Sequence, residues 1–156
     1  GLIARSGKTN KLILNQALDN FEKPIKSSLD IKDFDISFAR GLSLEDGCAT
    51  VTNFTAYLIA KGIEHANGNN SDLIKFLVCG GGRKNNYLIK SIKNYLSHKK
   101  NIILNSIDDY SLNGDCIESQ AFGYLAIRSF LNLPISYPKT TGCETPTLGG
   151  NLVENF

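Results

Sequence analysis

The chain has 156 residues, of which 42% are hydrophobic and 21% are charged, and its formal net charge is +2. This length and composition suit one soluble globular domain over residues 1–156, and so mild a charge does not indicate a nucleic-acid partner. No apolar run approaches the length of a membrane span, and the N-terminus lacks the apolar region of a signal peptide. We therefore expect a cytoplasmic protein without a membrane partner.

The four cysteines, Cys48, Cys79, Cys116 and Cys143, lie far apart in the sequence. They form no C-x-x-C pair and no histidines cluster near them, so we interpret them as reduced thiols and predict no metal-ligating residues. The chain begins at Gly1 and contains no methionine. We therefore expect a fragment of a longer protein.

Hydrophobic periodicity predicts helices in the first half of the chain. Residues 10–18 cluster apolar side chains at helical spacing, and residues 31–42 are interpreted as a further short helix. The strongest pattern covers residues 44–64 and predicts a helix with one buried face. The residues of this face recur every three or four positions: Leu44, Cys48, Val51, Thr55, Leu58, Ile59 and Gly62. Ser43 is the expected N-cap of this helix, with Asp46 in a box-like arrangement.

The second half of the chain alternates strand and helix patterns. Residues 73–79 and 101–104 are predicted strands, and residues 86–97 between them are a predicted helix with the apolar face Leu88, Ile89, Ile92 and Leu96. A further helix is expected over residues 117–131, and the tail over residues 137–151 is expected to be an ordered loop. This order predicts an α/β fold with a parallel β-α-β unit flanked by helices.

Three consecutive glycines, Gly80, Gly81 and Gly82, follow the first predicted strand and precede the helix expected from Asn85 or Asn86. Glycine is the usual residue for a tight strand-to-helix turn, which is a purely structural interpretation. A ligand site is the other interpretation, because open α/β sheets bind ligands at the carboxyl ends of their strands. The G-x-G-x-x-G dinucleotide motif is not matched, because position 85 is Asn, and this disfavours a dehydrogenase.

The segment from Ser6 to Thr9 reads Ser-Gly-Lys-Thr and resembles the end of a phosphate-binding P-loop. A P-loop needs its two glycines five residues apart, whereas Gly1 and Gly7 are six apart and no strand precedes them. We interpret the segment as a polar turn that enters the first helix.

Charged residues near the glycines have structural explanations. The lysines and Arg83 that follow the turn are interpreted mainly as a solvated helix face, and both histidines as surface residues. Asp115 and Glu118 have the spacing of a helix capping box. A carboxylate at a helix entrance can instead hold sugar hydroxyls, and the local sequence does not decide between these roles. No pair of a nucleophile and a base is apparent.

Taken in order, several segments resemble the C-terminal part of the anhydro-N-acetylmuramic acid kinase family. The most specific are the Cys-Gly-Gly-Gly-x-x-Asn block at residues 79–85 and the Glu-x-x-Ala-Phe-x-x-Leu-Ala block at residues 118–126. Weaker matches are residues 4–8, 26–30, 45–52 and 140–142. Arg83 and Asn86 depart from the family, which more often has a small residue and Pro at these two positions.

The resemblance implies the second lobe of a two-lobed kinase with the actin-like, ribonuclease H-like fold. It implies that Gly80, Gly81, Gly82 and Asn85 contact the nucleotide and that Glu118 contacts the sugar. ATP and Mg²⁺ are the implied cofactors, the sugar is the small-molecule partner, and a homodimer through this lobe is expected.

The family reaction opens the 1,6-anhydro ring of anhydro-N-acetylmuramic acid with water and phosphorylates the freed 6-position from ATP, during peptidoglycan recycling. The family's base lies in an Asp-Thr-Gly-Pro-Gly-Asn segment and its phosphate loop in a Gly-Thr-Ser-x-Asp-Gly segment. Neither occurs here, so no catalytic residue is assigned and both are expected upstream of Gly1. The alternatives are another actin-like sugar kinase and a non-catalytic nucleotide-binding module.

Overall fold

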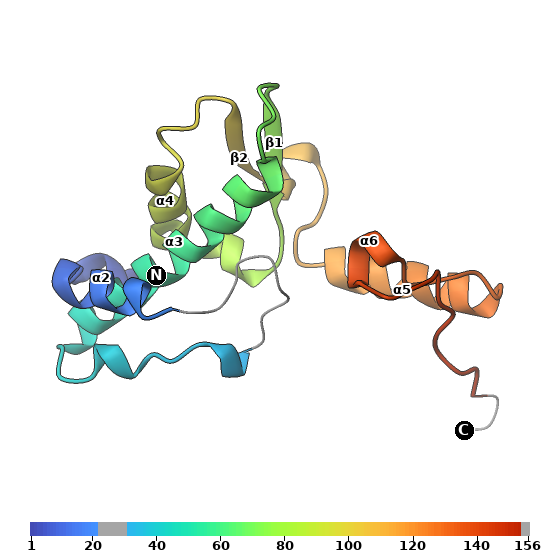
Figure 1. Cartoon of the computed structure of the whole chain (residues 1–156), viewed down its shortest axis with the longest axis horizontal. Helices are drawn as coiled ribbons and strands as arrows, with labels where there is room; N and C mark the ends of the chain where they lie inside the picture. The colour runs from blue at the N-terminus through green and yellow to red at the C-terminus, as the bar shows by residue number, and fades with distance from the viewer. Residues whose placement is uncertain (22–30, 154–156) are drawn as a thin grey trace.

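The computed structural model describes residues 1–21 and 31–153. The described residues form helices, two strands and several single turns of 3₁₀ helix (η) (Figure 1). In chain order the elements are α1 (Leu2–Ser6), α2 (Lys11–Asp19), η1 (Ile31–Asp33), η2 (Ser37–Ala39), α3 (Leu44–Asn67), β1 (Ile74–Val78), η3 (Gly81–Lys84), α4 (Asn86–Tyr95), β2 (Ile102–Ser106), η4 (Ile107–Tyr110), α5 (Ile117–Phe130) and α6 (Pro138–Thr141). None of the described helices is both long enough and apolar enough to cross a bilayer.

The two strands form a parallel sheet, and α4 connects the end of the first strand to the start of the second. The register runs from Ile74 opposite Ile102 to Val78 opposite Ser106. Parallel neighbours need a crossover connection, and α4 supplies it. The predicted α/β class and the β-α-β unit are therefore confirmed.

The core lies between α3, α4 and the sheet. Its buried members are Ala56 and Ala60 of α3, Ile92 and Leu96 at α4, and Leu104 of β2. The two alanines are one turn apart, so α4 can approach α3 closely. Leu88 and Ile89 pack against the same cluster, which confirms the predicted apolar face of α4. Burial of this face, more than helix propensity, stabilises a ten-residue helix.

Helix α3 begins where the sequence predicts. The Ser43 hydroxyl accepts a hydrogen bond from the Asp46 amide at 3.2 Å, so Ser43 is the N-cap. The Asp46 carboxylate does not complete a capping box; it accepts a bond from the Lys8 amide at 2.7 Å. This contact ties the N-terminal segment to the start of α3.

The N-terminal region differs from the prediction in two places. Helix α1 is present although no helix was predicted there, and residues 31–42 contain two 3₁₀ turns, η1 and η2, instead of one short helix. Helix α2 was predicted correctly to within a residue, and the Asn10 side chain caps it by accepting from the Ile13 amide at 3.1 Å. Residues 26–30, a segment of weak family resemblance, lie outside the described residues.

Helix α5 and the tail lie to one side of the rest of the molecule, beyond the segment that follows β2 (Figure 1). Helix α5 ends one residue before its predicted end. The tail is mainly loop, as expected, with the short helix α6 and a bridge between Ser136 and Thr147. Arg128 of α5 donates to the Pro134 carbonyl at 2.7 Å and to the Tyr137 hydroxyl at 2.6 Å, which holds the tail against the helix.

Candidate functional site

The glycine turn, residues 80–82, leaves the end of β1 in a conformation that requires glycine at its first position. Gly80 has φ 74° and ψ 179°, a region of backbone space that is almost exclusive to glycine. The next residues form η3, and α4 begins at Asn86. The predicted positive φ is therefore confirmed at Gly80 alone within this turn.

Gly81 and Gly82 have ordinary φ values but open space above them. A Cβ atom built on either residue meets no atom within 4 Å, and both residues are exposed. Neither packing nor backbone strain thus explains why these two positions are glycine. An uncovered stretch of backbone is what a ligand that lies flat on the main chain requires.

Asn85 caps helix α4. Its side-chain oxygen accepts a hydrogen bond from the Leu88 amide at 3.1 Å, which satisfies one of the free N–H groups of the first turn. A capping role alone accounts for asparagine at this position. The nucleotide contact expected of Asn85 stays a prediction.

Arg83 is not part of a solvated face. Its side chain is only 7% exposed, and it donates from Nε to Asp108 at 2.6 Å and from Nη1 to Asp115 at 2.6 Å. Nη1 also donates to the Gly80 carbonyl at 2.9 Å. Lys84 donates to the second Asp115 oxygen at 2.6 Å. The first two basic residues after the turn are thus held by carboxylates, whereas Lys90 is exposed as expected.

These contacts stabilise the ionised carboxylates. The hydrogen bond from Arg83 lowers the pKa of Asp108 to about 2, and the Gly114 amide adds to the effect. Hydrogen bonds from Arg83 and Lys84 hold the pKa of Asp115 well below its usual range. Both aspartates are therefore charged at neutral pH, and the positive charge of Arg83 is locally compensated.

The predicted capping box of α5 is wrong. The N-cap is Cys116, which makes no side-chain cap bond, and the Asp115 carboxylate is bound to Arg83 and Lys84. Glu118 lies exposed in the first turn of α5, and its carboxylate makes no hydrogen bond or ion pair within the described parts of the chain. The spacing of Asp115 and Glu118 predicted a capping box, but the partners of Asp115 lie more than 30 residues away and cannot be inferred from the local sequence.

A direct contact joins the glycine turn to the approach to α5. The Gly80 amide donates to the Gly114 carbonyl at 2.9 Å, and the Gly114 amide donates to Asp108 at 2.8 Å. The glycine turn is thereby bonded to the segment that leads into the helix that carries Glu118. Sequence reasoning missed Asp108, whose only local signal is its position just after the second strand.

The segment 6–9 is structural, as predicted. The Lys8 amide binds Asp46, and the Thr9 hydroxyl accepts from the Asn53 side chain at 2.8 Å. Both histidines are exposed, also as predicted. His98 has a partner that the sequence did not reveal, because its Nε2 lies 2.9 Å from a Glu64 oxygen.

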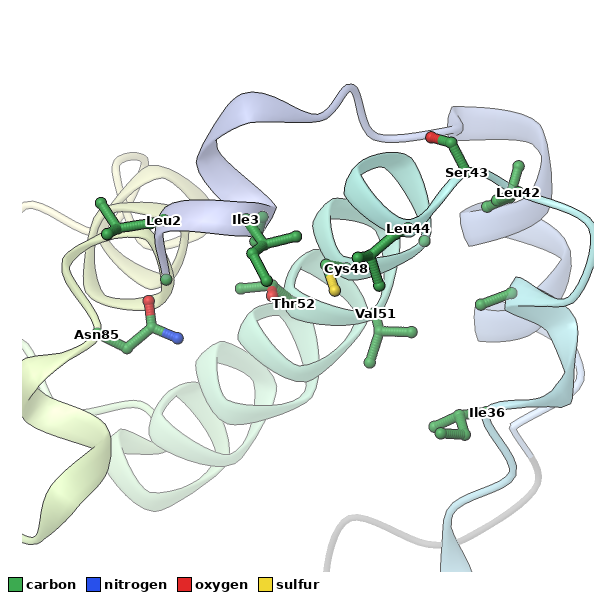
Figure 2. A pocket seen from close by; sticks show the side chains of 14 residues that line it. Leu2, Ile3, Ile36, Leu42, Ser43, Leu44, Cys48, Val51, Thr52 and Asn85 are labelled. Atoms are coloured by element: carbon green, nitrogen blue, oxygen red, sulfur yellow. The ribbon is translucent and has the colours of Figure 1, made fainter.

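A cavity of about 860 Å³ lies between α1, α3 and the segment around η2 (Figure 2). Leu2, Ile3, Ile36, Leu44 and Val51 contribute aliphatic side chains to its wall. No Asp, Glu, Lys or Arg is among the described residues that line it. Ser43, Thr52 and the predicted site residue Asn85 also line it. Because it offers no cation to a phosphate, the exposed glycine turn remains the better candidate for the nucleotide.

No group of three His, Cys, Asp or Glu side chains in residues 1–21 and 31–153 is arranged to hold a metal ion. All four cysteines are free thiols.

The sequence model of the family described as Anhydro-N-acetylmuramic acid kinase matches residues 2–155. Curated proteins named anhydro-N-acetylmuramic acid kinase are similar throughout the chain. The protein from Pelagibacter ubique is 50% identical, with 100% of this chain and 42% of that protein aligned. Those from Zymomonas mobilis and Caulobacter vibrioides are 38% and 37% identical, over 97% and 98% of this chain. The chain spans about two-fifths of the length of these relatives.

Proposed function

The chain belongs to the anhydro-N-acetylmuramic acid kinase family, and we propose that it forms one side of the active site of an ATP-dependent kinase for 1,6-anhydro-N-acetylmuramic acid. One observation carries this proposal. The bond between the Gly80 amide and the Gly114 carbonyl joins the first of the two family blocks, residues 79–85, to the segment that leads into the second, residues 118–126. A kinase needs its nucleotide and its acceptor side by side, and this contact supports such an arrangement.

We assign the chain to the second lobe of a two-lobed, actin-like kinase with the ribonuclease H-like fold. The parallel β-α-β unit supports this assignment. So does α5, which has no buried residue and exposes 64% of Phe122, 61% of Ile127 and 68% of Phe130. Apolar side chains exposed together on one helix are typical of a surface that another part of the protein covers. A homodimer stays a prediction, which sedimentation of the full-length protein tests.

In this proposal the adenosine lies over the open backbone of Gly81 and Gly82, with Gly80 and Asn85 at the two ends of the turn. The space above the two glycines supports this role. Glu118 accepts hydrogen bonds from the sugar. Its exposed carboxylate, which has no partner among the described residues, supports this role because a capping function is excluded.

The proposed reaction has a ring-opening part and a transfer part. Water adds to C1 of the sugar and gives a proton to the base, the bond between C1 and O6 breaks, and O6 takes the γ-phosphoryl group while ADP leaves. Positioning and charge stabilisation supply most of the rate enhancement in phosphoryl transfer. We assign the base and the phosphate loop to sequence outside this chain. Mg²⁺ is expected to arrive with the ATP phosphates, and we assign no metal ligand to the described residues.

The test uses the full-length protein with ATP, Mg²⁺ and 1,6-anhydro-N-acetylmuramic acid in water enriched in ¹⁸O. We expect ADP and a sugar 6-phosphate that carries the label at C1. A product without phosphate would contradict the kinase proposal, and an unlabelled phosphorylated product would contradict the ring opening by water. The same assay compares amino sugars that contain a 1,6-anhydro bridge with amino sugars that lack it. This comparison separates the proposed enzyme from another actin-like sugar kinase. The absence of turnover with every sugar, despite nucleotide binding, would favour a non-catalytic module.

We also propose a cytoplasmic location. The four free thiols support it, because unpaired cysteines are typical of a reducing compartment. Fractionation of cells that produce the tagged full-length protein tests the location.

A further inference from the structure

Four hydrogen bonds connect the Arg83 guanidinium to three separate places in the chain. Two go to Asp108, which lies in η4 just after β2, at 2.6 and 3.3 Å. The others go to Asp115 at the approach to α5 and to the carbonyl of Gly80. A planar guanidinium with five N–H donors suits such a branched contact, whereas a lysine ammonium does not.

The backbone is built around this side chain. Gly114 is buried, and a Cβ atom on it would lie 2.4 Å from Arg83 Nε and 2.8 Å from Arg83 Cζ. Asp108 receives both Arg83 and the Gly114 amide. The Ser106 hydroxyl adds a further bond to Asp108 at 3.0 Å. The segment from β2 to α5 thus closes over the guanidinium on several sides.

We propose that Arg83 is a positioning residue that holds the entrance of α5 against the glycine turn and so sets the place of Glu118 relative to the nucleotide. This inference rests on the function proposed above. Arg83 is not expected to touch the nucleotide or the sugar, because its donors are directed at Asp108, Asp115 and Gly80. Its effect on the reaction passes through the position of α5.

The first arm of the test measures hydrogen exchange of single amides in the ligand-free, full-length protein. Arg83→Ala removes the guanidinium, and Gly114→Ala displaces it while keeping all its partners. Lys90→Ala is the matched control, because it removes an exposed positive charge on α4, away from the glycine turn. In both test variants the amides of Gly80 and Gly114 should exchange roughly tenfold faster or more, since local opening becomes easier. Unchanged exchange in both variants would overturn the proposal.

The second arm measures kinetics with the sugar. Arg83→Ala should lower kcat/KM for the sugar by about 10- to 100-fold, as small displacements of reacting groups do. The Kd of MgATP without sugar should change by less than about twofold, the range of independent effects. When Arg83→Ala is added to Glu118→Gln, kcat/KM should fall by less than a further factor of about two. A full additional loss in that background, or a loss of ATP affinity instead, would overturn the proposal.

The two hypotheses fail in different ways. If Glu118→Gln has wild-type sugar kinetics, the sugar role proposed for Glu118 is wrong. Faster exchange at Gly80 and Gly114 in both variants would then still support Arg83 as the residue that holds the entrance of α5. If Glu118→Gln impairs sugar use but Arg83→Ala leaves both exchange and kinetics unchanged, the proposed function stands and the positioning role is wrong.

Discussion

Alanine substitutions in the glycine turn should separate backbone strain from ligand contact. Gly80 has φ 74° and ψ 179°, where a residue with a Cβ costs about 1–3 kcal/mol. For a protein with 150–250 residues, each kcal/mol corresponds to about 2–4 °C in Tm. The relatives are more than twice as long as this chain, and the shift per kcal/mol falls as chain length grows, so Gly80→Ala should lower the Tm of the full-length protein by about 1–6 °C.

Gly82→Ala should behave differently. Its Cβ meets no atom within 4 Å and its φ is ordinary, so unfolding free energy should stay within about 0.5 kcal/mol of wild type. The new methyl group would occupy the space assigned to the adenosine. We expect the Kd of MgATP to rise about tenfold, which corresponds to ~1.4 kcal/mol.

Thermal and urea unfolding measure the stability of each variant, and calorimetric titration measures its Kd for MgATP. Gly62→Ala serves as a control in α3, where the Cβ also has open space. It should stabilise the protein by about 0.5–1 kcal/mol, because alanine favours helix interiors, and should leave the Kd unchanged. Wild-type stability of Gly80→Ala would refute the strain argument. Unchanged ATP affinity of Gly82→Ala would refute the position assigned to the nucleotide.

Three further predictions concern the carboxylates and the chain itself. Glu118→Gln in the full-length protein should lower kcat/KM for the sugar by about 10- to 100-fold, the worth of a hydrogen bond to a charged group, with an unchanged Tm; a lower Tm with normal kinetics would mean a structural role. Because the pKa of Asp108 is lowered to about 2, its stabilising contacts should be complete above about pH 5 and be lost as the pH falls from about 4 towards 2. Carboxyl ¹³C NMR should show this titration, and in Arg83→Ala the pKa should return towards the ordinary value of about 3.9. The 156-residue chain by itself should bind MgATP weakly or not at all in calorimetry, whereas micromolar affinity would show that it holds the complete nucleotide site.

Local patterns predicted most of the elements correctly. The Ser43 cap of α3 and the apolar face of α4 depend on neighbours within one or two turns, so the sequence contains the information needed to predict them. The same holds for the parallel β-α-β unit, which follows from the order of its segments. The predicted face of α3 was wrong, because Leu44 and Ile59 are exposed and the helix buries small residues such as Ala56 and Ala60 where α4 packs against it. Helix α1 is five residues long, and its contact with α3 is tertiary. Such a short helix has too little periodicity to be recognised in a sequence.

By itself, the sequence determined the turn between β1 and α4, including the need for glycine at Gly80, because backbone conformation there is a local property. Only the tertiary structure decided the roles of the charged residues around that turn. Local spacing predicts that Asp115 caps α5 and that Arg83 belongs to a solvated face, because it reflects only residues that are near in the sequence. The folded chain brings Asp108 and Asp115 to Arg83 across 25 and 32 residues of sequence. Ion pairs between segments so far apart depend on how β2 and α5 pack beside the turn, and no spacing in the sequence encodes that packing.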